Sequence, residues 1–276
     1  MARTKDPHAA TVKAWETRKR GSLGDRERRL LGPVSKVKEQ KGGVSDTFKV
    51  TLEDGTEGNF KLRGRHTQYG TPEAEVAAWE VAKLVGMDDM VPAAAVRAIE
   101  STTLRGPLDG VAGAQRDGSF AEWQEGTVAN KLPLRARGPL TRPVGGRFGD
   151  SEHDVKRTAM FDWVTGQGDR HSGNWVVDDG QVRLIDHNLA FKPGSPRSMF
   201  LDLVAFGSGG TESPAAYIKP YLDKLPHILA VLREVGDSQG RSDGKWITAV
   251  DFDARARALE ARVHRAASAK TWRDLT

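Results

Sequence analysis

The sequence predicts an α+β protein of two lobes, an antiparallel sheet lobe with one key helix followed by a mainly helical lobe. Three observations support this fold class. Alternating segments punctuated by glycine gather before residue 63, one helical pattern follows them, and apolar residues at helical spacing dominate after residue 150. We expect a basic extension at 1–33, an N-terminal lobe at 34–126 and a C-terminal lobe at 127–276.

The N-terminal lobe is predicted to open with paired strands. A helical extension ends at Gly32-Pro33, and strands at 44–52 and 58–62 flank the turn Glu53-Asp54-Gly55. A helix then begins with Thr71 as N-cap and ends at Gly86. Residues 90–99 form the next strand candidate, and Phe120 to Gly126, FAEWQEG, reads as a linker-like segment.

The C-terminal lobe is predicted to contain one hairpin among helices. The strongest helical pattern covers 154–164, and two short strands at 175–177 and 181–185 enclose the turn Asp178-Asp179-Gly180. A loop at 192–197 follows. The remaining helical patterns lie at 199–206, 215–222, 226–235 and 252–267.

Composition narrows the class of protein. The 276 residues are 38% hydrophobic, carry no cysteine and contain no apolar run long enough to cross a bilayer, so we expect a cytoplasmic protein without a transmembrane segment. The net charge is +5, and much of the excess precedes residue 42. A charge run of this kind is usually a solvated arm. No groove-reading motif accompanies it, so we expect no sequence-specific nucleic-acid partner.

Three residues in the second half predict the chemistry. Asp169, Asn174 and Asp186 have the order and nearly the spacing of the catalytic base and the two metal ligands of kinase-like phosphotransferases. The predicted hairpin would bring Asn174 and Asp186 together at its open end, where carboxylate and amide oxygens suit magnesium. Asp169 would orient the proton of an attacking hydroxyl. We expect Arg170 to neutralise nearby carboxylates and His171 to pack or hydrogen-bond within the loop.

The first half offers the groups that would hold a nucleotide. Lys61 is the candidate cation for the phosphates, and Glu75 on the following helix is its preferred partner. Two other glutamates of that helix, Glu73 and Glu80, compete for this role. A glycine turn upstream could present backbone N–H groups to the phosphates through Gly42, Gly43 and Ser45.

The segments FDWVTGQGDRHSGNW and VRLIDHNLAF resemble the catalytic region of the atypical kinases that include type II phosphatidylinositol 4-kinases and HipA-type bacterial toxin kinases. The resemblance implies a two-lobed protein-kinase-like fold in a bacterial or phage-encoded member of this phosphatidylinositol 3/4-kinase-like and HipA-like group. It implies that Lys61 is the ATP lysine, Asp169 the catalytic residue, and Asn174 and Asp186 the metal ligands.

Two further segments extend the resemblance. EVAAWEVAKLVGMDDMVPAAAVR is similar to the family's helix and following strand, which supports Glu75 as the partner of Lys61. FAEWQEG resembles the hinge, which implies that Trp123, Gln124 and Glu125 bind adenine through the backbone. The chain departs from the pattern at Asn188, where many relatives have glycine, and in its glycine-rich loop. VAGAQ at 111–115 resembles the HipA-type phosphate loop, but it lies on the wrong side of the Lys61 strand.

Several functions fit these residues. We expect a kinase that uses ATP and Mg²⁺, with Mn²⁺ as an alternative, and whose unknown acceptor is a Ser or Thr hydroxyl of a protein, its own chain included. A phosphatidylinositol-type lipid kinase is the first alternative, although the absence of cysteine for palmitoylation favours a protein acceptor. A nucleotide-binding pseudokinase or assembly scaffold is an alternative from another class. Transfer of AMP also remains open.

Overall fold

The computed structural model describes residues 23–40, 47–62, 72–99, 117–131, 151–178, 181–238 and 252–276. Five predicted features lie outside these residues. They are the first 22 residues of the basic extension, the phosphate-loop candidates Gly42, Gly43 and Ser45, the N-cap Thr71, the VAGAQ segment at 111–115, and the turn residues Asp179 and Gly180.

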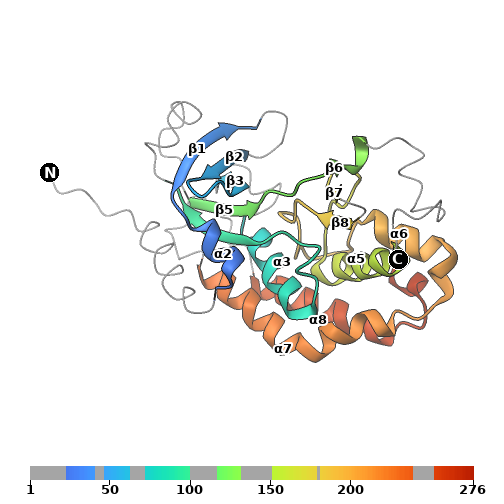
Figure 1. The fold of residues 1–276 in the computed structure, drawn as a ribbon. Coiled ribbons are helices and arrows are strands. Elements are labelled where there is room, and N and C mark those ends of the chain that lie inside the picture. The colour runs from blue at the N-terminus through green and yellow to red at the C-terminus, as the bar shows by residue number, and fades with distance from the viewer. Residues whose placement is uncertain are drawn as a thin grey trace.

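Within the described residues, an antiparallel sheet forms the first half of the fold in the order β1-β2-β3-β5-β4 (Figure 1). Its strands are β1 Val34–Glu39, β2 Thr47–Leu52, β3 Glu57–Leu62, β4 Ala94–Ala98 and β5 Asp117–Glu122. β2 and β3 alternate strictly between buried and half-buried positions, as strands with one face on a core do. Gly55, with φ at 84°, makes the turn between them, as the sequence predicts.

Two helices of the described residues belong to this half. The longer, α3 (Pro72–Val85), packs on β4 and β5 with nearly every described side chain buried except at its C-terminal end, where Gly86 terminates it at φ 72°. The shorter, α2 (Asp25–Leu30), precedes β1. Its Glu27 is buried and accepts hydrogen bonds from Trp79 Nε1, at 2.9 Å, and from Lys83 Nζ. These bonds attach α2 to α3.

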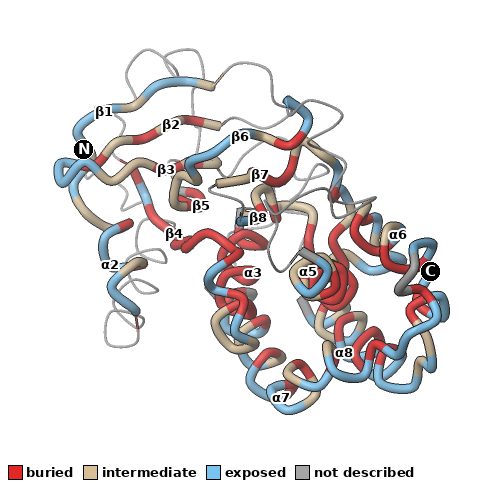
Figure 2. Tube along the Cα trace, turned by 45° about the vertical axis from the view of Figure 1, so that its right-hand side comes forward, coloured by how far each residue is buried: buried red, intermediate tan, exposed pale blue. Residues whose placement is uncertain are grey.

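The second half is mainly helical. Its helices are α5 Ser151–Thr165, α6 Met199–Phe206, α7 Ala215–Ser238 and α8 Phe252–Ser268, and its short 3₁₀ turns are Ala129–Lys131, Ser208–Thr211 and Trp272–Leu275. A small sheet in the order β6-β7-β8 comprises β6 Thr127–Val128, β7 Trp175–Asp178 and β8 Gln181–Leu184. α7 packs against α3 and α8 against α5, so one hydrophobic core joins the two halves (Figures 1 and 2).

The structure corrects the predicted pair of helices at 215–222 and 226–235, because one helix, α7, covers both. Pro220 and Pro226 lie inside it, although an interior proline typically costs about 3 kcal/mol. An unbroken apolar face explains why the helix continues, since α7 packs on α3 and α8 and has core side chains both before and after the prolines. They are Ile218, Tyr221, Leu225, Ile228, Leu232 and Val235.

Four smaller corrections concern strands and the first helix. Residues 120–122 of the linker-like segment are the end of β5, and the backbone becomes irregular only from Trp123. The strand expected at 90–99 begins at Ala94, because residues 87–93 turn after α3. β6 is a strand of only two residues, too short for a sequence pattern to predict it. The described part of the helical extension is helical only at Asp25–Leu30.

Among the described residues, no helix is both long and apolar enough to cross a membrane.

Candidate active site

Lys61 lies between two carboxylates from distant parts of the chain. Its Nζ donates hydrogen bonds to Glu75 Oε1 and, at 2.8 Å, to Asp186 Oδ1. Phe60 and Leu62 point into the core from the same strand, so alternation places Lys61 on the opposite face of β3. The structure therefore joins Lys61 to Glu75 of α3 and to Asp186 after β8.

The competing glutamates of α3 have other surroundings. Glu80 accepts a hydrogen bond from Lys83 at 3.1 Å, and Glu73 is buried within electrostatic reach of Arg255. Only Glu75, of the three, bonds to Lys61 in the described contacts.

The electrostatics of the group are mutually reinforcing. Burial alone would lower the pKa of the Lys61 ammonium, but Glu75 and Asp186 outweigh burial and raise this pKa above its usual value. Burial would likewise raise the pKa of Asp186, but the Lys61 ammonium holds that pKa below its usual value. Both groups are therefore charged at neutral pH.

The hairpin of β7 and β8 brings Asn174 and Asp186 to one end. Trp175 pairs with Leu184, and just beyond that pair Ile185 N donates to Asn174 O at 3.0 Å. Asn174 Nδ2 donates to Asp169 O at 2.7 Å, so the amide of Asn174 is oriented by the loop that carries Asp169. The hairpin predicted from the sequence is confirmed, and it assembles the three residues.

The Asp169 side chain is half exposed, whereas Arg170 and Asn174 of the same loop are buried. His171 Nε2 lies 3.6 Å from Asp169 Oδ2, and His171 Nδ1 accepts from Gly173 N at 2.9 Å. His171 thus hydrogen-bonds within its own loop, as expected, although its side chain is exposed. Gln167, fully buried, accepts from Asp169 N at 3.3 Å and donates to Asp186 O at 3.2 Å. This residue, which the sequence interpretation missed, connects Asp169 with Asp186.

A buried ion pair supports the loop from beneath. The Arg170 guanidinium donates from Nε to both oxygens of Asp162 and from Nη2 to Oδ1, each at 3.2 Å, and both side chains are fully buried. Nη1 of Arg170 also donates to Asn174 O at 2.5 Å and to Ile185 O at 2.6 Å. Ser198 Oγ donates to Asp162 Oδ2 at 2.6 Å. Arg170 does neutralise a carboxylate, and the carboxylate belongs to α5.

Asp162 was not selected from the sequence, although a signal for it existed. It is a charged residue within the apolar run Met160-Phe161-Asp162-Trp163-Val164, all of which is buried. A carboxylate in such a place needs a cationic partner.

Helix α8 fixes the segment that follows Asp186. Arg255 Nη1 donates to Ala190 O at 2.9 Å, and Arg262 Nη1 donates to Lys192 O at 3.1 Å. Arg262 Nε also donates to Val164 O, at 3.0 Å, near the C-terminus of α5. The guanidinium packs against Gly166, where an added Cβ would lie 2.6 Å from Arg262 Cζ. Two buried arginines of one helix, seven positions apart, therefore hold the backbone after the hairpin.

The hinge candidates follow β5 directly. Trp123 N donates to Glu57 O at 2.8 Å, and Lys49 Nζ lies 4.2 Å from the centre of the Trp123 ring. Gln124 Nε2 donates to Trp123 O at 3.2 Å, and Glu125 is exposed. All three lie where the chain runs from β5 of the first sheet to β6 of the second. Among the described residues, none of them hydrogen-bonds to Lys61.

The donor set around Asp186 suits a hard cation. Asp186 offers a carboxylate, and Asn174, whose amide nitrogen is engaged by Asp169 O, leaves its amide oxygen for a metal. No group of three His, Cys, Asp or Glu side chains able to hold a metal occurs within the residues that the structure describes. Nucleotide-bound Mg²⁺ typically takes one or two oxygen ligands from the protein, and substrate phosphates and water complete its coordination.

No family model and no curated protein sequence matches the chain. Solved structures do match it. The Golgi casein kinase with Mn and ADP bound has a TM-score of 0.53 and 14% identity, over 90% of this chain and 74% of the other. Hydra Fam20 with sugar has a TM-score of 0.55 and 13% identity, over 88% and 86%. The kinase-like α+β fold predicted from the sequence is confirmed.

Proposed function

We propose that the chain is an ATP- and Mg²⁺-dependent phosphotransferase, with Mn²⁺ as an alternative, that acts on a Ser or Thr hydroxyl of a protein. The observation that carries this proposal is the Lys61 ammonium between Glu75 and Asp186. Asn174 lies on the same hairpin end as Asp186, and its amide is bonded to the loop of Asp169. The nucleotide and metal of the Golgi casein kinase structure support it.

Lys61 would contact the nucleotide phosphates. An ammonium has three N–H donors, and Glu75 and Asp186 take two of them, which leaves one for a phosphate oxygen. Glu75 holds Lys61 in place because it comes from α3, whose position is fixed by its packing on β4 and β5. The ion pair thereby keeps the ammonium at the site without substrate.

Asp186 and Asn174 would hold the metal ion. When bound, the ion would neutralise negative charge on the phosphates. The hairpin fixes the separation of these two residues, because strand pairing extends to the residues beside them.

Asp169 would receive or orient the proton of the acceptor hydroxyl. In the reaction, the acceptor oxygen bonds to the γ-phosphorus, the bond from that phosphorus to the β–γ bridging oxygen breaks, and the hydroxyl proton passes to the carboxylate. The half-exposed side chain of Asp169 is reachable by an acceptor from solvent. Gln167 and Asn174 hold its backbone on two sides.

The remaining assignments extend this proposal. Trp123, Gln124 and Glu125 would meet the adenine, and Gly42, Gly43 and Ser45 would approach the phosphates. We retain the boundaries 1–33, 34–126 and 127–276 for the extension and the two lobes.

The test uses ATP labelled at the γ or the α phosphate, with Mg²⁺ and a panel of proteins, peptides and lipids. We expect γ-label in protein, a loss of about 10²-fold or more in Asp169→Asn and Asp186→Asn, and a clear loss in Glu75→Gln. Glu80→Gln is the matched control, because Glu80 lies on the same helix and bonds to Lys83.

Other outcomes would overturn the proposal. Transfer of α-label would indicate nucleotidyl transfer. Nucleotide binding without any transfer would indicate a pseudokinase or scaffold, and label only in lipid would indicate a lipid kinase.

A further inference from the structure

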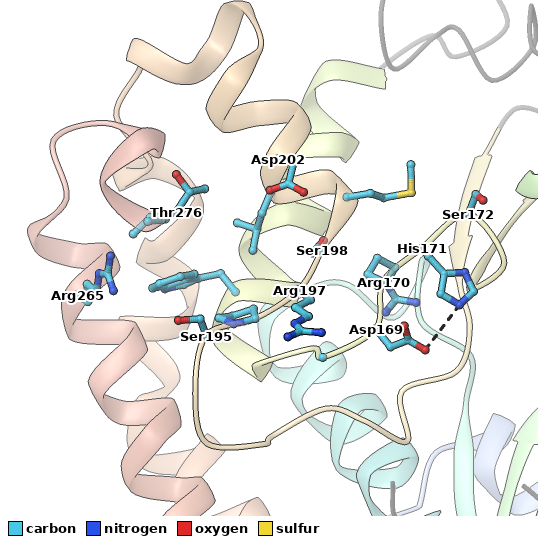
Figure 3. Close-up of a pocket in the computed structure, with 16 residues that line it drawn as sticks. Asp169, Arg170, His171, Ser172, Ser195, Arg197, Ser198, Asp202, Arg265 and Thr276 are labelled. Carbon is cyan, nitrogen blue, oxygen red and sulfur yellow. Dashed lines mark ion pairs between the residues drawn. The ribbon is translucent and has the colours of Figure 1, made fainter. Parts of the chain in front are cut away.

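A groove of about 720 Å³ opens beside Asp169 (Figure 3). This volume is within the range of sites that enclose a ligand. Its walls come from the loop 168–172, the segment 195–198, the first turn of α6 and Arg265 of α8. Any acceptor that reaches Asp169 from this side enters the groove.

Two short segments pair along the groove and direct their side chains alternately. Arg170 and Ser198 form a parallel bridge, and both side chains turn inward to the same buried carboxylate, that of Asp162. The preceding residues on the two segments are Asp169 and Arg197. Because successive side chains of extended chain point to opposite sides, Asp169 and Arg197 point outward as neighbours, and both line the groove.

The backbone of Arg197 is fixed to the loop of Asp169. Arg197 N donates to Gln167 O at 2.7 Å, and Arg197 O accepts from Arg170 N at 3.0 Å. Its side chain, in contrast, is exposed, and no carboxylate of the described residues pairs with its guanidinium. Within the described part of the chain, the structure thus holds a permanent cation beside Asp169 that no carboxylate pairs.

A second arginine continues this wall. Arg265 lies with its guanidinium 5.1 Å from the centre of the Trp163 ring, and its Nη2 donates to Asp274 O at 2.9 Å. A carbonyl partner does not cancel the charge. His171 lines the opposite part of the groove near Asp169.

One acidic side chain besides Asp169 lines the groove, that of Asp202, and Thr276, the last residue of the sequence, lines it as well. Asp202 lies in the first turn of α6, where the positive end of a helix favours a negative charge. Asp202 is therefore partly compensated by its own helix, whereas Arg197, on an extended segment, is not.

We propose that this groove binds the acceptor as an acidic protein segment, with Asp169 at the Ser or Thr hydroxyl and Arg197 on a carboxylate within two residues of it. The proposal rests on the proposed function, because it assigns the acceptor of that same site. Adjacent strands lie about 4.8 Å apart, so Asp169 and Arg197 can meet groups that are near neighbours in a peptide. Arg265 would meet acidic residues further along.

The surface around the groove favours a protein segment over a membrane lipid. Among large apolar side chains of the described residues, only Phe206, at the far end of α6, is exposed. Membrane surfaces are usually met by apolar side chains that enter the interface. The groove instead combines charged groups with buried apolar residues such as Trp163 and Leu201.

The test compares three peptides that share one Ser and differ only in flanking residues, which are Glu, Gln or Lys. For the wild type we expect kcat/KM for the Glu peptide to exceed that for the Gln peptide about tenfold, mostly through KM, as one charge-assisted contact predicts. In Arg197→Gln the ratio should fall to about one, and Arg197→Glu should prefer the Lys peptide. Arg233→Gln, an exposed arginine of α7, is the control and should keep the wild-type ratio.

Peptide binding, measured by fluorescence anisotropy with and without nucleotide, separates this inference from the proposed function. Binding of the Glu peptide that depends on Arg197, without phosphoryl transfer, would support the groove and contradict the kinase function. Transfer to all three peptides with a ratio unaffected by Arg197→Gln would overturn the inference and leave the kinase function standing. Transfer to anionic lipid vesicles that depends on Arg197, without transfer to peptides, would overturn the protein acceptor.

Discussion

Replacing Asp162 with Asn tests whether a buried ion pair holds the loop of Asp169. The substitution keeps the shape of the side chain and removes its charge. Asp162 accepts three hydrogen bonds from Arg170 and one from Ser198, and neither member of the ion pair is exposed. The variant would leave the Arg170 guanidinium buried without the carboxylate that is paired with it.

The expected cost is about 3–5 kcal/mol in the free energy of unfolding, which is typical when one partner of a buried ion pair is removed. The Arg170 Nη1 contacts to Asn174 O and Ile185 O remain, so the loss should not exceed this range. Because most domains are stable by only about 5–15 kcal/mol, a change of this size is large.

Urea unfolding followed by circular dichroism and tryptophan fluorescence would measure the change. Asp154→Asn is the matched control, since Asp154 lies on the same helix and forms a partly exposed ion pair with Arg157 at 3.2 Å. It should cost at most about 1 kcal/mol. If Asp162→Asn were no more destabilising than Asp154→Asn, the buried pair would not be holding the loop and this reasoning would be wrong.

Two other predictions concern the helices that hold the site from outside. Arg262→Leu should lower the free energy of unfolding by about 3 kcal/mol, because it leaves carbonyls such as those of Val164 and Lys192 without their charged donor. Urea unfolding would measure this loss and show whether Arg262→Lys restores part of the lost stability. Glu27 is buried, yet hydrogen bonds from Lys83 and Trp79 outweigh that burial and hold its pKa below the usual value. Since the folded-state pKa is depressed, the stabilisation is present above the unfolded pKa of about 4.3 and is lost as the pH falls through the folded value. Glu27→Gln should therefore flatten the loss of thermal stability between neutral and acidic pH, whereas exposed Glu260→Gln should not.

The sequence predicted those parts of the fold that local pattern determines. The turn at Gly55, the helix that ends at Gly86 and the hairpin after Asn174 all follow from side-chain periodicity and turn residues close in the chain. α7 could not be predicted in the same way, because its continuation through Pro220 and Pro226 depends on burial against α3 and α8. Rules based on local sequence predict that a helix ends at each proline.

In the candidate site, the residues that belong to a motif were predicted, and those that support them through distant contacts were not. The positions of Lys61, Glu75 and Asp186 were chosen by order and type, and the structure brings them together across 125 positions of chain between Lys61 and Asp186. Their supports were missed, since Gln167 and Asp162 act through contacts that have no motif of their own. Asp162 offered only the anomaly of one charge in an apolar run.

Along two paired backbone segments, residues that face the groove alternate with residues that bind Asp162, so the two sets should move together. Asp169 and Arg197 face the groove, while Arg170 and Ser198 bind Asp162 behind them. Neither pair can shift without the other, because they share the same two backbone segments and the hydrogen bonds between them. Loss of the Asp162 charge should therefore weaken both the proton transfer at Asp169 and the acceptor preference set by Arg197. A substitution at Arg197, which leaves the buried pair intact, should alter the preference while the free energy of unfolding stays within about 0.5 kcal/mol of the wild type.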